Sequence, residues 1–321
     1  MCRKIISFRL IAFLLCISVI MTFSSCSQPI SQTNNSGKIK VVTTLFAQYD
    51  FTRRVAGELA DVTLLLKPGV ESHTYEPSPS DIVTIRNSDL FIYTGKYMES
   101  WAQGIISGLS GEKTTVLDVS EGISLINTAD EHKDDDESGH DDTHMHQMDP
   151  HIWTSPANAV IMVKNIAAAL SKTDPVHADT YNANAQDYIS ELQTLDNDFS
   201  EMINSSKRRE IMFGGRFAMY YFAQHYGLEC MSAYDSCSSE AEPVAKLVAK
   251  IIDKIKSENI GAVYYEEMSN HSVADRIAED TGASALLLHS CHNVSSEELA
   301  RGETYLSLMR RNLENLRKGL N

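Results

Sequence analysis

The chain has 321 residues, and its 43% hydrophobic and 8% aromatic content is that of a globular protein with room for two domains. Its 28 Lys and Arg face 43 Asp and Glu, for a formal net charge of −15. This acidic balance argues against nucleic acid and anionic membrane surfaces as partners, and it is compatible with cations.

The first 25 residues are typical of a secretion signal. A basic start is followed by an apolar run over 10–23, which is shorter than the roughly 20 residues that a membrane span needs. We therefore prefer a signal over a transmembrane anchor. Cys26 at the cleavage point predicts a bacterial lipoprotein, secreted and lipid-anchored to the outer face of the cytoplasmic membrane or periplasmic. Residues 26–38 form a polar tether.

Three cysteines remain after the lipidated one, in a compartment where disulfides persist. One pair and one leftover thiol is the simplest account. We expect the pair to be Cys237–Cys291, because both follow apolar strands in polar, turn-like contexts. Cys230 lies within an apolar alternation and is predicted to be a buried thiol.

Strands and helices alternate along the chain, which implies parallel βαβ units with sites at the carboxyl ends of the strands. Strands are predicted at 39–45, 61–67, 90–94 and 114–119, and again at 210–214, 228–234, 261–266 and 283–288. Helices are predicted at 51–59, 80–86 and 156–170, and later up to residue 226 and at 245–257, 271–280 and 297–320.

A long helix is predicted at 175–204, after the cap and first-turn pair Asp174-Pro175. Its apolar residues form one stripe, which favours packing within the chain over a coiled-coil dimer. We interpret it as a rigid connector between an N-terminal α/β lobe (39–174) and a C-terminal α/β lobe (205–321) of a monomer.

An acidic, histidine-rich loop is predicted at 129–148, inside the N-terminal lobe. Nine Asp or Glu residues lie between 130 and 149. Imidazole and carboxylate are ligands of divalent transition metals. The loop contains four histidines, His132, His140, His144 and His146.

The chain resembles the substrate-binding lipoproteins of zinc and manganese ABC importers, over essentially the whole mature sequence. The resemblance implies two α/β lobes with a metal in the cleft between them, delivered to an importer permease. Zinc-type members often carry a histidine-rich loop before D-P-H-x-W, and some have a disulfide in the C-terminal lobe. The segments that carry the resemblance are P-G-V-E-S-H-T-Y-E-P-S-P-S-D at 68–81, D-P-H-I-W at 149–153, Y-F-A-Q-H-Y-G-L at 221–228, S-S-E-A-E-P-V-A-K at 238–246, A-E-D-T-G-A at 278–283 and Y-L-S-L-M-R-R-N-L at 305–313.

The resemblance implies two histidine ligands from the N-terminal lobe, and these map onto His73 and His151. Neutral imidazoles suit Zn²⁺ better than Mg²⁺ or Ca²⁺. Both motifs are intact, so we expect both histidines to bind the metal.

The C-terminal lobe departs from the family pattern. Arg216 occupies the position of a usual ligand, and a guanidinium cannot bind a metal. Its expected role is to pair with Glu240, Glu242 or Glu266. At the end of the last strand the usual Asp is replaced by His289, which we expect to be the third ligand, with His292 or water as the alternative.

Glu266 matches a glutamate of the family, and we expect it to support the site rather than to bind the metal. Three histidines and one oxygen favour Zn²⁺ over Mn²⁺. A manganese-binding homologue, a surface metal buffer and an adhesin are the alternatives to zinc transport. A hydrolase is disfavoured, because neither H-E-x-x-H nor G-x-S-x-G occurs in the sequence.

Overall fold

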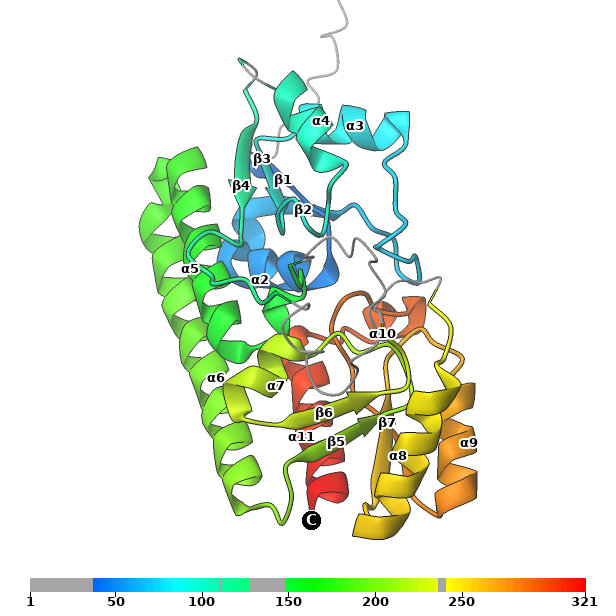
Figure 1. Cartoon of the computed structure of the whole chain (residues 1–321). Coiled ribbons are helices and arrows are strands. Elements are labelled where there is room, and N and C mark those ends of the chain that lie inside the picture. Colours follow the sequence, from blue (N-terminus) through cyan, green and yellow to red (C-terminus); the bar gives the residue numbers. More distant parts are fainter. Residues whose placement is uncertain (1–36, 110, 112, 128–147, 236–240) are drawn as a thin grey trace, which may run out of the picture. The chain divides into compact units, whose positions relative to one another are not determined.

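The computed structural model describes residues 37–109, 111, 113–127, 148–235 and 241–321, and it groups residues 39–321 into one compact unit. This unit contains two four-stranded, fully parallel sheets (Figure 1). The strand order is β2-β1-β3-β4 in the first and β6-β5-β7-β8 in the second, so both follow one topology. The strands are β1 Ile39–Thr43, β2 Ala60–Leu64, β3 Leu90–Tyr93, β4 Thr115–Asp118, β5 Glu210–Phe213, β6 Glu229–Ser232, β7 Ala262–Tyr265 and β8 Ser284–Leu287.

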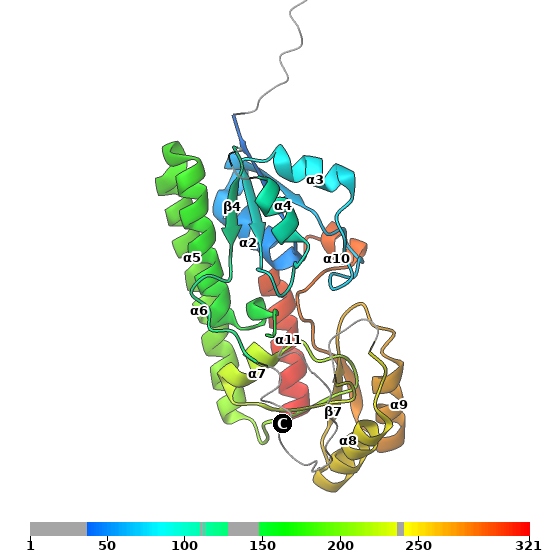
Figure 2. The same cartoon turned by 45° about the horizontal axis from the view of Figure 1, so that its top comes forward.

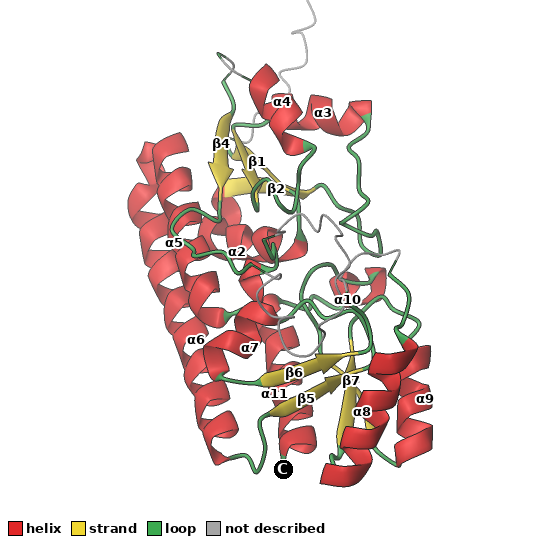
Figure 3. Ribbon diagram, in the orientation of Figure 1, coloured by secondary structure: helices red, strands yellow, loops and turns green. Residues whose placement is uncertain are grey.

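Helices cover both faces of each sheet (Figure 3). In the first half they are α2 Phe46–Ala56, α3 Pro79–Arg86, α4 Ala102–Gly108 and α5 Pro156–Thr173, with 3-10 turns η2 Gly57–Leu59, η4 Ile152–Thr154 and η5 Pro175–His177. The others are α6 Ala178–Ser205, α7 Tyr220–Tyr226, α8 Ala245–Glu258, α9 Ser272–Thr281, α10 Ser296–Ala300 and α11 Tyr305–Leu320.

Alternation along the strands decides which core each side chain enters. On β1, Val41 faces the core shared with α2 and α5, whereas Val42 faces the smaller core with α3 and α4. On β7, Val263 packs toward α8 and α9, while its neighbour Tyr264 faces the other way. This period of two follows from the pleat, and it explains why both faces of these strands are apolar.

The 28-residue helix α6 runs beside both sheets and is about 42 Å long at 1.5 Å per residue (Figure 2). Its predicted apolar stripe is buried, including Tyr188 and Leu192 near the middle of the helix. A single large core continues from α2 and α5 through α6 to α11. The two halves are therefore joined by a continuous apolar core and not by α6 alone. The single helix predicted at 297–320 is two helices, because Gly302 in a left-handed turn separates α10 from α11.

Several predicted features lie outside the described residues. These are the signal at 1–25, the tether up to residue 36 with Cys26, and residues 129–147 of the histidine-rich loop. Asn127 and Met148, on either side of the undescribed stretch, form an antiparallel bridge. No helix in the described part of the chain is long and apolar enough to cross a bilayer.

Candidate metal centre

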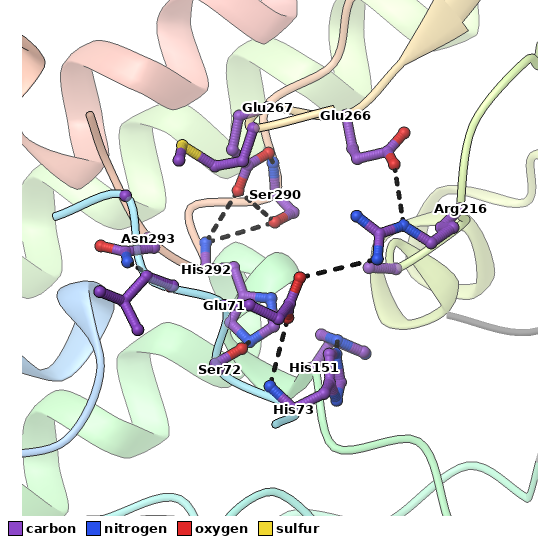
Figure 4. A pocket seen from close by; sticks show the side chains of 14 residues that line it. Glu71, Ser72, His73, His151, Arg216, Glu266, Glu267, Ser290, His292 and Asn293 are labelled. Atoms are coloured by element: carbon purple, nitrogen blue, oxygen red, sulfur yellow. Dashed lines mark hydrogen bonds and ion pairs between the residues drawn. The ribbon is translucent and has the colours of Figure 1, made fainter. Parts of the chain in front are cut away.

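Three histidines converge at the carboxyl ends of the two sheets: His73, His151 and His292 (Figure 4). One nitrogen of each lies within 4.8 Å of the others, and the ring centroids are 5.0 to 5.2 Å apart. The Nε2 atoms of His73 and His151 are 3.2 Å apart. With Zn–N bonds of 2.0–2.1 Å, two ligands of a tetrahedral zinc ion would be separated by about 3.3 Å. The spacing therefore fits a shared metal ion.

The first two histidines are held by residues close to them in sequence. His73 lies on the loop between β2 and α3, where its backbone N–H donates to the Glu71 carboxylate at 3.2 Å. Asp149 accepts from the backbone N–H of His151 at 2.8 Å and lies 3.2 Å from its Nδ1. This contact places the ring proton on Nδ1 and leaves Nε2 free to bind a metal.

His292 reaches the cleft on the loop after β8. The Glu267 carboxylate holds this loop by accepting from the backbone N–H groups of Ser290, at 2.7 Å, and of His292, at 3.2 Å. Asn293 then donates to the backbone carbonyls of Lys67, at 2.9 Å, and Val70, at 2.8 Å. The loop that carries His292 is thus tied directly to the loop that carries His73.

Burial keeps the imidazoles of His73 and His292 in the form that binds metals. Desolvation, together with repulsion from His151, lowers the pKa of His73 to about 4. Desolvation also lowers the pKa of His292, which His73 and His151 lower further. Both rings are therefore neutral at physiological pH, with lone pairs available to a divalent cation.

His289, the expected third ligand, is not part of this cluster. Its side chain is fully buried beneath the cleft, and its Nδ1 accepts from the backbone N–H of Cys291 at 2.9 Å. Its Nε2 faces Glu298 at 3.7 Å. The turn at 289–292 instead brings His292, the predicted alternative, to the other two histidines. Cys291 adopts a φ of 59°, which places His292 rather than His289 in the cleft.

Arg216 pairs with Glu266, one of the three partners expected for it, through an Nε–Oε1 contact of 3.2 Å. Its Nη1 is also 3.6 Å from Glu71, a partner that the sequence did not indicate. Of the other expected partners, Glu240 is outside the described residues. Glu266 lines the cleft but is not in the three-histidine cluster.

Sequence reasoning missed contacts that join the two halves around the metal centre. The indole of Trp153 donates to the Ser290 carbonyl at 2.8 Å, and the Ser72 hydroxyl contacts Nε2 of His292. The Tyr305 hydroxyl donates to the Trp153 carbonyl at 2.7 Å. Trp153 and Ser72 were within the quoted motifs, but their partners are more than 130 residues away in sequence and could not be identified.

The expected Cys237–Cys291 disulfide is not seen. Cys291 is a fully buried free thiol beside the carbonyl of His289, and Cys237 lies outside the described residues. Cys291 is enclosed in the large apolar core, which explains why it does not behave as an exposed turn residue. The loop histidines His132, His140, His144 and His146 also lie outside the described residues.

Comparison with known proteins identifies the family of this chain. Residues 41–319 match the family described as zinc-uptake complex component A, periplasmic. The high-affinity zinc uptake system protein ZnuA of Bacillus subtilis is 33% identical over 305 residues, which cover 95% of each chain. The zinc-binding protein AdcA of Streptococcus pyogenes is 34% identical over 88% of this chain, but that match spans only 56% of AdcA.

A solved structure shows the same fold. The Zn(II)-bound ZnuA-like domain of Streptococcus pneumoniae AdcA superposes with a TM-score of 0.74 at 30% identity, covering 88% of this chain and 99% of that domain. The family match spans most of the described residues, including both sheets and all three clustered histidines. The chain therefore belongs to the family of periplasmic zinc-uptake complex component A proteins.

Proposed function

We propose that this protein binds one Zn²⁺ ion in the cleft between its two sheets and delivers it to an ABC importer. The observation that carries the proposal is the convergence of three imidazoles from three separate loops. Two of these loops follow strands of the first sheet, and the third follows β8 of the second. A metal bound there would be held by both halves of the molecule, as a carrier requires.

The donor set favours zinc over manganese. Three neutral nitrogen ligands suit Zn²⁺, whereas Mn²⁺ prefers carboxylates and water. Three glutamates line the cleft, of which Glu266 is paired with Arg216 and Glu267 is engaged by the loop that carries His292. Only Glu71 is not held in this way, so among the described residues the site offers three nitrogens and at most one carboxylate, which still favours Zn²⁺. The family is one of uptake components and not of enzymes.

The partner we propose is the permease of an ABC importer, to which a monomer delivers the ion. A lipid on Cys26 would hold the protein at the outer face of the membrane, and the polar tether would allow it to reach the permease. The large core shared by both halves implies that release needs only a small displacement of the cleft loops.

The histidine-rich loop is proposed to collect metal near the cleft. Its ends meet in the bridge between Asn127 and Met148. The Tyr221 hydroxyl fixes this junction, because it accepts from the backbone N–H of Ile126 at 3.1 Å and donates to the Asp149 carbonyl at 2.7 Å. The chain leaves the loop only three residues before His151, so ions captured there would be close to the cleft.

The test is Zn²⁺ titration of the purified protein against a fluorescent chelator, with Mn²⁺ as the competitor. The wild type should bind one cleft ion with a preference for Zn²⁺. The double variant His73→Ala/His151→Ala should lose this tight binding while its unfolding transition is retained. Equal Zn²⁺ affinity in the wild type and the double variant would refute the proposal.

A further inference from the structure

The three-histidine cluster leaves one position of a tetrahedral zinc site without a ligand among the described residues. The cavity beside it has a volume of about 140 Å³ and is lined by three glutamates, Glu71, Glu266 and Glu267. A structural zinc ion takes four protein ligands. The question is which of these carboxylates can reach the metal.

Glu267 is fully engaged. Its Oε2 accepts from the Ser290 backbone N–H at 2.7 Å, and its Oε1 accepts from the Ser290 hydroxyl at 2.6 Å and from the His292 backbone N–H at 3.2 Å. Moving this carboxylate to the metal would break the hydrogen bonds that place His292. Glu267 therefore belongs to the support of the loop.

Glu266 is confined. It is 8% exposed and receives a hydrogen bond from Nε of Arg216 at 3.2 Å. Its Oε2 occupies the space that a side chain on Gly215 would fill, since a Cβ built there would lie 1.8 Å from that oxygen. The missing side chain of Gly215 forms a slot that holds the carboxylate beside Arg216.

Glu71 differs from both. It lies two residues before His73 on the same loop, and its carboxylate points into the cleft between His73 and Arg216 (Figure 4). Its one hydrogen bond among the described residues is from the His73 backbone N–H, at 3.2 Å to Oε1. Its side chain is 34% exposed, so its rotamer can change without disturbing the core.

Arg216 places a positive charge close to the Glu71 carboxylate. Its Nη1 lies 3.6 Å from Oε2 of Glu71, while its Nε is committed to Glu266. A guanidinium next to a divalent cation is repelled unless an anion lies between them. A carboxylate placed between the two positive charges removes that conflict, and Glu71 is the acidic side chain that already faces both.

We propose that Glu71 is the fourth metal ligand and that Arg216 is its positioning residue. This inference rests on the proposed metal-binding function. A rotation of the Glu71 side chain exchanges its hydrogen bond, from the His73 backbone N–H to Oε1, for a bond to the metal, while Oε2 stays close to the guanidinium. A carboxylate that bridges the metal and Arg216 turns the unusual arginine of this cleft into part of the binding site.

The first experiment compares Glu71→Gln with Glu76→Gln. Glu76 is an exposed glutamate on the same loop that does not line the cavity, so this control removes the same charge nearby. Glu71→Gln should lower Zn²⁺ affinity by about 10- to 100-fold, because water can take the vacated position, while Glu76→Gln changes it by less than about twofold. The visible spectrum of the Co²⁺-loaded protein should change only in Glu71→Gln.

The second experiment tests the role of Arg216. Arg216→Met should also weaken binding, and the double variant Glu71→Gln/Arg216→Met should bind no more weakly than Glu71→Gln alone, because the two residues act as one unit. In Glu71→Ala, added acetate should restore the Co²⁺ spectrum when Arg216 is present and fail to do so in Glu71→Ala/Arg216→Met.

The inference is overturned if Glu71→Gln binds Zn²⁺ within about twofold of the wild type, or if its Co²⁺ spectrum is unchanged, because the fourth ligand would then be water or another anion. If the losses in Zn²⁺ affinity of the two single variants add up in the double variant, Arg216 does not act as the positioning residue of Glu71. If the wild type itself binds no Zn²⁺, the proposed function fails, whereas equal binding by the wild type and Glu71→Gln refutes only this inference.

Discussion

The two halves of the metal centre are built in different ways. In the first half, His73 and His151 are each positioned by an acidic residue two places earlier in the chain, Glu71 and Asp149. In the second half, His292 is positioned by Glu267, which is 25 residues away. One half is organised by local turns, and the other depends on the tertiary fold.

This difference teaches that short motifs can specify the first half, whereas the second half depends on contacts between residues far apart in the chain. The loop after β8, supported by Glu267, brings His292 rather than His289 to the two histidines of the first half. Arg216 can occupy the cleft because Glu266 and Glu71 both lie close to it. We expect substitutions in the two halves to fail in distinguishable ways.

The largest effect is expected from the loss of a single histidine ligand in either half. If a zinc-binding free energy of about 10–16 kcal/mol is divided among four ligands, each contributes roughly 3–4 kcal/mol, which corresponds to about 100- to 1,000-fold in affinity. His151→Ala and His292→Ala should therefore weaken Zn²⁺ binding by similar factors in chelator competition. His271→Ala, which removes an exposed histidine bonded to Asp275, is the matched control. Wild-type affinity in His292→Ala would show that the second half supplies no imidazole.

The next effect concerns a buried acid in the first half. Glu99 is buried at the carboxyl ends of β1 and β3, where it contacts the Thr44 hydroxyl and accepts from the Thr94 backbone N–H at 3.0 Å. The Thr44 hydroxyl itself donates to Gln48 at 2.8 Å, so its oxygen is left to accept a hydrogen bond from the O–H of a neutral Glu99. Burial raises the pKa of Glu99 from 4.5 to about 8.

The raised pKa makes stability depend on pH in a defined direction. The unfolded chain loses the Glu99 proton near pH 4.5, whereas the folded protein keeps it up to about pH 8. Stability is therefore complete below pH 4.5 and decreases as the pH rises toward 8, with a loss on the order of 3 kcal/mol at pH 7. Glu99→Gln keeps both hydrogen bonds without a charge, so it should remove this dependence in urea unfolding of the metal-free protein. If the free energy of unfolding of Glu99→Gln changed with pH in parallel with that of the wild type, this prediction would be wrong. Glu121→Gln, at an exposed position, is the control.

The sequence predicted the parts of this molecule that local patterns determine. The strand at 39–45 was recognisable because its β-branched residues face two cores, and His73 and His151 were found because their turns are encoded within a few residues. The sequence favoured His289 over His292 as the third histidine of the site, whereas the structure brings His292 to the other two. This difference depends on the backbone of Cys291, a residue with no intrinsic preference for positive φ. The Arg216–Glu71 contact joins residues 145 positions apart and has no local signature.

A smaller effect concerns the orientation of His151. Asp149→Asn should weaken Zn²⁺ binding by about 10- to 100-fold, because an amide is a poorer acceptor for the Nδ1 proton and the ring is less firmly held. The measurement is chelator competition, and Asp198→Asn on the exposed face of α6 is the control. Unchanged affinity in Asp149→Asn would mean that the first half does not depend on this local contact.

The smallest effect on metal binding should come from His289, which separates structural from ligand roles in the second half. Its Nδ1 accepts from Cys291, and its backbone is clamped by Asn312, which accepts from the His289 N–H at 2.7 Å and donates to its carbonyl at 2.7 Å. His289→Ala removes the acceptor for Cys291, the contact of Nε2 with Glu298 and a fully buried ring, so it should lower the free energy of unfolding by about 2–4 kcal/mol and change Zn²⁺ affinity by less than about threefold.

His289→Asn should recover part of this stability, because its Oδ1 can replace Nδ1 as the acceptor for Cys291. Urea unfolding and chelator competition on the same preparations separate the two quantities. If His289→Ala instead lost Zn²⁺ binding as severely as His151→Ala while His292→Ala did not, the third ligand would be His289, and the turn at Cys291 would have to rearrange when metal binds. Retained binding with reduced stability assigns His289 to the support of the loop and leaves His292 as the residue through which the second half holds the ion.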